Sequence, residues 1–97
     1  MVIALFWQEF EAWQGALPPS VTSTARELEQ PSGAGRAVQL DLATPGRLVQ
    51  VTIWESGDVD LIMGDLSTGE ILANEHREVT TRIGLRGLLG DVSEAIS

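Results

Sequence analysis

The residues best suited to chemistry are acidic side chains and one histidine in the second half of the chain. Asp58, Asp60, Asp65 and Glu70 lie close enough together in the sequence to suggest a calcium site. A calcium loop of the EF-hand type needs oxygen ligands at its first, third and fifth positions, glycine at the sixth and glutamate at the twelfth. Counted from Asp58, the fifth position is Ile62, so the pattern fails.

His76 is the only histidine, and the chain contains no cysteine. An ordinary zinc site therefore lacks its ligands. His76 could act as a general base, but no serine lies in a nucleophile-elbow motif, and Gly33 and Gly35 do not match a phosphate-binding loop. A pocket that holds His76 beside a carboxylate would favour an enzyme, and a convex surface would argue against one. The residues predict no catalytic activity, no cofactor and no bound metal.

The acidic residues are concentrated around a tryptophan. Seven of the fourteen lie between Glu55 and Glu78, where Arg77 is the only arginine. Such a surface suits a basic, partly apolar partner, because charge speeds association and an aromatic side chain supplies desolvated contact. A solvated sheet edge that its charge keeps from aggregating explains the pattern equally well. The predicted partner-binding residues are Trp54, Asp58, Asp60, Asp65, Glu70, Glu75 and His76.

Composition narrows the class of protein. The 97 residues are enough for one domain, expected to span residues 1–97. Six arginines, no lysine and fourteen acidic residues give a net charge of −8, which opposes binding to nucleic acid or to an anionic membrane; simple solubility also accounts for it. No apolar run approaches the roughly 20 residues that span a bilayer, and the lack of cysteine suits a cytoplasmic protein.

The segment from Arg47 to Leu66 predicts a central hairpin. Apolar and other residues alternate as in half-buried strands, and Ser56-Gly57-Asp58 supplies turn residues. We expect Glu55 to face Val59 across this turn. The predicted inner face carries Val49, Val51, Ile53, Val59, Leu61 and Met63. The predicted outer face carries Gln50, Thr52, Trp54, Asp60 and Ile62.

The flanking segments predict an α+β fold: an N-terminal helix, an antiparallel meander of four to five strands and a C-terminal helix, with both helices packed on one face of the sheet. The helix from Val2 to about Leu17 carries four of the five aromatic residues and is expected to supply the bulk of the core. Three further strands are expected at Ser20–Leu28, Arg36–Ala43 and Glu70–His76, with a loop at Glu29–Gly35. Pairing of Thr44 with Arg47 across Pro45-Gly46 places Leu42 opposite Val49. The last helix has an apolar stripe of Leu85, Leu88, Leu89, Val92 and Ile96.

One run of residues resembles a known family. The residues that carry the resemblance are Val51-Thr52-Ile53-Trp54-Glu55-Ser56-Gly57, Asp60, Asp65, Thr68-Gly69-Glu70, Glu75-His76 and Glu78. They resemble the TriTu-type immunity proteins of bacterial polymorphic toxin systems over about Arg36 to Thr81, and loosely over the C-terminal helix. The resemblance implies a small cytoplasmic protein that binds and neutralises a toxin encoded beside it, and the family has no assigned catalytic residues.

The sequence leaves alternatives for the location of the binding surface and for the function. The binding surface is expected on an outer sheet face centred on Trp54, whereas the competing hypothesis places Trp54 in the core and the binding surface at Ser20–Gly35. The alternative function is a generic acidic interaction module with no toxin partner, or a self-associating one. An exposed edge strand would permit a weak homodimer of that kind.

Overall fold

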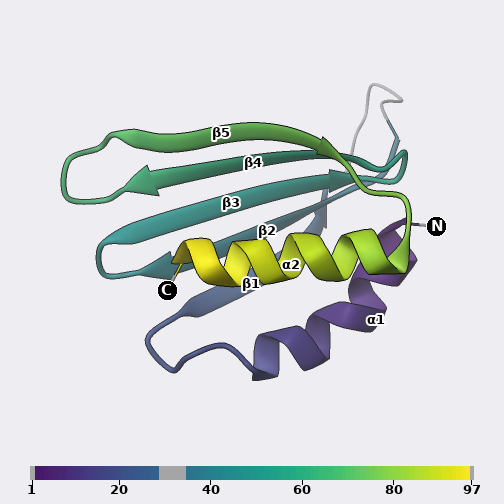
Figure 1. Cartoon of the computed structure of the whole chain (residues 1–97), viewed down its shortest axis with the longest axis horizontal. Helices are drawn as coiled ribbons and strands as arrows, with labels where there is room; N and C mark the ends of the chain where they lie inside the picture. The colour runs from purple at the N-terminus through teal and green to yellow at the C-terminus, as the bar shows by residue number, and fades with distance from the viewer. Residues whose placement is uncertain (1, 29–34, 97) are drawn as a thin grey trace.

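The computed structural model describes residues 2–28 and 35–96 and has one five-stranded sheet with two helices (Figure 1). The elements follow the predicted order of helix, meander and helix. Their bounds are α1 Val2–Gly15, β1 Thr22–Leu28, β2 Ala37–Thr44, β3 Arg47–Trp54, β4 Asp58–Asp65, β5 Ile71–Glu78 and α2 Arg82–Ile96. The predicted α+β class is confirmed. Most of the predicted loop, residues 29–34, lies outside the described residues.

The sheet is an antiparallel meander in the order β1-β2-β3-β4-β5. Thr44 pairs with Arg47 and Leu42 with Val49, as the Pro45-Gly46 turn predicts. The apolar residues that alternate along β2, β3 and β4 are buried on one face. The buried residues of this inner face are Val38, Leu40, Leu42, Val49, Val51, Ile53, Val59 and Leu61.

The register of the central hairpin differs from the prediction by two residues. Ile53 lies opposite Val59, not Leu61, and Glu55 lies in the turn instead of facing Val59. The turn is tighter because Gly57 N donates a hydrogen bond to Trp54 O at 2.9 Å, with Gly57 at a φ of 100°. Side chains alternate with a period of two, so a shift of two residues leaves every side chain on its predicted face.

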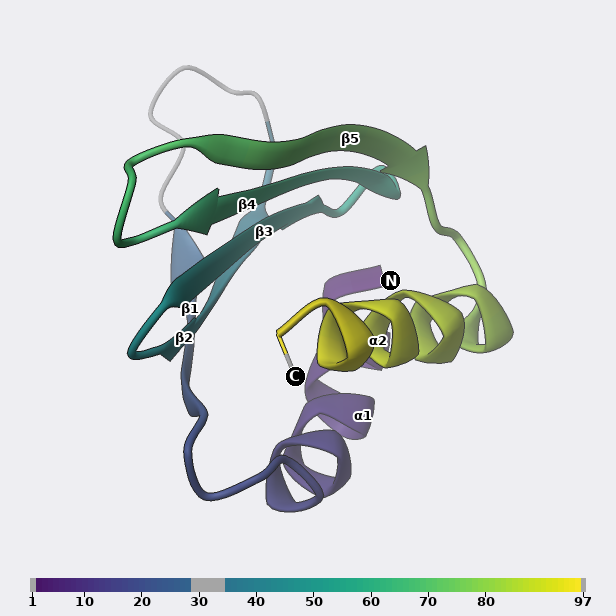
Figure 2. The same ribbon diagram turned by 60° about the vertical axis from the view of Figure 1, so that its left-hand side comes forward.

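Both helices pack on the same face of the sheet (Figure 2). The whole predicted stripe of α2 is buried: Leu85, Leu88, Leu89, Val92 and Ile96. At the start of this helix, Thr81 Oγ1 accepts a hydrogen bond from Gly84 N at 3.0 Å, which makes Thr81 the N-cap. No helix among the described residues is long and apolar enough to cross a membrane.

The N-terminal helix contributes less to the core than its aromatic residues predict. Only Val2, Ile3 and Phe6 of α1 are buried. The two indoles of α1 are partly exposed, because each N–H donates to a polar partner at the rim of the core. Trp7 Nε1 donates to Glu27 on β1, and Trp13 Nε1 donates to the main-chain oxygen of Leu89 at 2.9 Å. The sheet and α2 therefore provide most of the core.

Candidate partner-binding site

The sheet face opposite the helices carries the residues that alternate with the core. Thr52, Asp60 and His76 are aligned across β3, β4 and β5 by the strand register. Trp54 lies on the same face at the end of β3 and is half-buried, opposite Ala37 of β2. The competing expectation that Trp54 belongs to the core is therefore wrong. We call this helix-free side the outer face.

The turn between β3 and β4 positions Trp54 and Asp58 on the outer face. Gly57 occupies a left-handed conformation, and a Cβ atom added to it would lie 2.8 Å from Val79 O. Val79 N in turn donates a hydrogen bond to Gly57 O at 2.7 Å. This contact ties the turn to the chain that leaves β5. The contact with Val79 therefore restricts the backbone of the turn. This restriction holds Trp54 and Asp58, at the two ends of the turn, in place.

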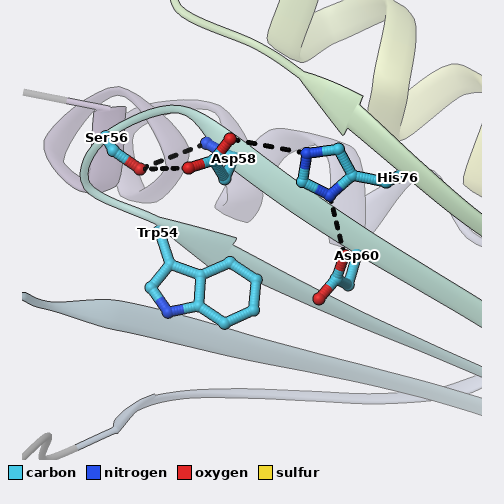
Figure 3. A pocket seen from close by; sticks show the side chains of 5 residues that line it. All are labelled: Trp54, Ser56, Asp58, Asp60 and His76. Carbon is cyan, nitrogen blue, oxygen red and sulfur yellow. Dashed lines mark hydrogen bonds and ion pairs between the residues drawn. The ribbon is translucent and has the colours of Figure 1, made fainter. Parts of the chain in front are cut away.

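Four polar side chains form a connected cluster beside Trp54 (Figure 3). His76 Nδ1 donates to Asp60 Oδ1 at 2.9 Å, and its Nε2 lies 3.4 Å from Asp58 Oδ1. Ser56 Oγ donates to Asp58 Oδ2 at 2.9 Å. These four residues and Trp54 line an open, shallow hollow of about 380 Å³. We call it the Trp54 hollow.

The two aspartates favour the charged form of the imidazole. The hydrogen bond that His76 donates to Asp60 is the main cause that raises the pKa of His76 above its ordinary value of 6.5, and the negative charges of Asp60 and Asp58 add to it. Partial desolvation acts in the opposite direction. The net charge of the hollow therefore changes with pH, from about −1 when His76 is protonated to −2 when it is neutral.

Two of the predicted residues lie at the other end of the strands. Asp65 Oδ1 accepts hydrogen bonds from the amide and the hydroxyl of Ser67, at 2.8 and 2.6 Å, and the pKa of Asp65 is lowered chiefly by that hydroxyl. Asp65 thus stabilises the β4–β5 turn. Glu70 is exposed in the same turn, and its main-chain oxygen accepts from Asp65 N. Neither residue lines the Trp54 hollow.

Glu75 lies on the opposite face of the sheet from His76. It pairs with Leu61, whose side chain faces the helices, whereas His76 pairs with Asp60. The carboxylate of Glu75 binds Arg77 at 2.9 Å, and Arg77 also binds Asp91 of α2 at 2.6 Å. The seven predicted residues are therefore divided, and the structure brings together Trp54, Asp58, Asp60 and His76.

Ser56 is a lining residue that sequence reasoning missed. Its turn position was recognised, but its hydrogen bond to Asp58 depends on the shape of the turn and has no signal in the residue pattern. Glu78 was counted among the acidic residues without being assigned to the site. It lies opposite Asp58 and so adds a further carboxylate to the outer face.

The arrangement does not pair a serine nucleophile with His76. The hollow does hold His76 beside a carboxylate, which is the feature expected of an enzyme. However, both imidazole nitrogens face aspartates, and the Ser56 hydroxyl donates to Asp58 instead of His76. A serine nucleophile needs a base within hydrogen-bond reach. Within residues 2–28 and 35–96, no group of three or more His, Cys, Asp or Glu side chains is arranged so that it could hold a metal ion.

Comparison with known proteins identifies the family. The family model described as "Immunity protein TriTu" matches residues 8–93, which covers most of α1, all five strands and most of α2. The match extends well beyond the stretch that carries the sequence resemblance. No curated protein and no solved structure matches the chain significantly. On the extent of the family match, the chain belongs to the TriTu family of immunity proteins.

Proposed function

We propose that residues 1–97 form one immunity-type domain that binds a cognate bacterial toxin protein in the cytoplasm and neutralises it by stoichiometric occlusion. Family membership supports the immunity role. The observation that carries the proposed mechanism is the Trp54 hollow, where a half-buried indole lies beside two aspartates on the outer face. We infer that this face covers the toxin and that the chain adds no chemistry of its own.

The energetic roles of the residues follow from their positions. Trp54 is the proposed anchor, because aromatic side chains dominate interface energetics, and its truncation should cost about 2 kcal/mol of binding free energy. Asp58 and Asp60 would contact the partner directly. A specific interface of about 800 Å² per partner fits one sheet face with its loops.

The charges outside the hollow would act at longer range. Asp65 and Glu70 lie at the far end of β4 and β5, and we assign them to attraction of the toxin before contact. A net charge of −8 favours a basic partner and repels nucleic acid and anionic membranes. The association rate should therefore fall as salt is added, because exposed charges are screened.

A self-associating module is the second candidate, and the edge of the sheet is the observation that favours it. Within the described sheet β5 is an edge strand, and Ile71 near its start is 68% exposed. Pairing of β5 with β5 of a second copy would extend the sheet. The like charge of −8 on each copy opposes such a dimer. Sedimentation at high concentration measures this: a monomer argues against self-association, and a stable dimer would favour it over the toxin partner.

The proposed function is tested by co-expression with the toxin encoded beside this chain. A Trp54→Ala variant should remain folded and lose protection. The control is Ile83→Ala, which removes an apolar side chain that is 83% exposed on α2, in the other layer of the fold. This control should protect normally. Normal protection by a folded Trp54→Ala protein would contradict the proposal and favour the competing surface at Ser20–Gly35.

A second comparison tests the role of charge. Asp60 and Glu75 are matched carboxylates: their side chains are 48% and 49% exposed, and each already binds a neighbouring side chain. They differ in lying on opposite faces of the sheet. Asp60→Asn should weaken toxin binding more than Glu75→Gln does, as measured by surface plasmon resonance. Equal effects would show that only the total charge matters and would contradict the assignment to the outer face.

A further inference from the structure

The Trp54 hollow has recognition groups that the folded chain does not use itself. Trp7 and Trp13 both donate their indole N–H to protein oxygens, whereas Trp54 Nε1 donates to no residue in the described part of the chain. Asp60 binds His76 through Oδ1 alone, and its Oδ2 accepts no hydrogen bond from the described residues. An open aromatic side chain and a carboxylate oxygen with capacity to accept therefore face one hollow.

The contacts of His76 indicate which chemical group the aspartates accommodate. The imidazole is a planar N–C–N unit, and a carboxylate lies at each of its two nitrogens, at 2.9 and 3.4 Å. A guanidinium presents the same planar arrangement of N–H donors, with more of them. Carboxylates bind it in a fork-like geometry, and an indole face stacks on it. A lysine ammonium is a point charge and matches neither feature.

The size of the hollow suits one side chain. Pockets for complete small molecules measure about 300–1,000 Å³ and enclose most of their ligand. The Trp54 hollow, at about 380 Å³, is at the lower end of that range and is open to solvent. It can hold the end of a side chain that belongs to a larger partner.

We propose that the Trp54 hollow receives a single arginine side chain of the toxin. The guanidinium stacks on the indole of Trp54 and donates hydrogen bonds to Asp60, next to the imidazole of His76. This inference rests on the proposed function and specifies its partner residue. Because the toxin arginine fills the hollow, it sets the register of the interface while the surrounding sheet face excludes substrate from the toxin.

His76 makes this recognition dependent on pH. The groups that face His76 are Asp58 and Asp60 of β4, with Glu78 two residues along β5 on the same face. When His76 is protonated, its charge offsets part of the negative charge that attracts the guanidinium. Arginine should therefore bind more tightly at pH 8 than at pH 6, and a His76→Gln variant should lose most of this difference.

The test uses small probes, so it does not require the toxin. N-acetyl-arginine amide is titrated into the ¹⁵N-labelled full chain, and the Trp54 indole N–H signal is followed by NMR. We expect saturable binding on the order of 1 mM. The neutral isostere N-acetyl-citrulline amide should bind about tenfold more weakly, because it lacks the charge for cation–π and charge-assisted contacts. The lysine derivative should also bind more weakly than arginine. The signals of Trp7 and Trp13 should not move.

Two variants locate the contact. Asp60→Asn should weaken arginine binding several-fold, and the matched Glu75→Gln control should leave it unchanged. Equal binding of citrulline and arginine, or an unchanged affinity in Asp60→Asn, would overturn the arginine assignment. If the arginine probe fails to bind but Trp54→Ala still loses protection, the inference is wrong and the proposed function stands. If Trp54→Ala protects normally, the proposed function itself fails.

Discussion

Replacement of Gly57 by alanine tests how the β3–β4 turn is held. Gly57 has a φ of 100°, in the left-handed region. A residue with a Cβ atom pays about 1–2 kcal/mol there. The new methyl group would also lie 2.8 Å from both Val79 O and the Thr80 Cγ2 atom. Cβ atoms in proteins essentially never approach another heavy atom this closely, so the turn or the Val79 segment must move.

Movement of the turn away from Val79 is costly, because a hydrogen bond joins the two segments. Val79 N donates to Gly57 O at 2.7 Å, and retreat of either segment would lengthen this hydrogen bond. A lost hydrogen bond costs about 0.5–1.5 kcal/mol. Gly57→Ala should therefore lower the free energy of unfolding by about 1.5–3.5 kcal/mol, a large part of the 5–15 kcal/mol that is typical of a small domain.

Gly69→Ala is the matched control, measured with Gly57→Ala by urea denaturation. Gly69 also has a positive φ, of 77°, but an added Cβ atom would meet nothing within 4 Å. Its replacement should lower the free energy of unfolding only by the cost of placing alanine in a left-handed backbone conformation, about 1–2 kcal/mol. The close approach at Gly57 thus predicts a difference of about 0.5–1.5 kcal/mol between the two variants. Losses that agree to within about 0.5 kcal/mol would refute the argument that Val79 restricts the turn.

Three further variants test the core, the helix contact and the histidine. Val51→Asp buries a carboxylate at a fully buried position of β3 and should abolish the cooperative thermal transition seen by circular dichroism; a melt near the wild-type temperature would contradict the assigned inner face. Trp13→Phe removes the indole donor to Leu89 of α2 and should cost about 1 kcal/mol in urea unfolding, whereas unchanged stability would show that this bond does not join the helices. His76 should titrate above 6.5 by NMR, and Asp60→Asn should bring its pKa back towards that value; no change would mean that Asp60 is not the cause. Since the folded-state pKa is raised, the stabilisation from this pair is complete below pH 6.5 and is lost as the pH rises through the folded-state value.

The faces of the central strands follow from the sequence alone. Apolar residues at every second position of β2, β3 and β4 can be buried together in only one way, because side chains of a strand alternate between faces. The Pro45-Gly46 turn also determines the pairing of Leu42 with Val49. Even the wrong pairing of Glu55 with Val59 preserved both faces, since the error was two residues. The alternation therefore predicted Trp54 on the outer face, and the structure was needed to reject the competing hypothesis that Trp54 lies in the core.

The composition of the site was decided by tertiary structure. The sequence of β5 has no sustained apolar alternation that would predict which of its faces joins the core. In the structure, β5 is exposed along most of its length. Its pairing with β4, interrupted by an irregularity between Met63 and Gly64, is what places His76 beside Asp60 and Glu75 opposite Leu61. Neighbouring residues thus face opposite sides of the sheet. Charge density along the chain groups Glu75 with His76, but consecutive side chains of a strand point to opposite faces, so the two residues are separated in the sheet.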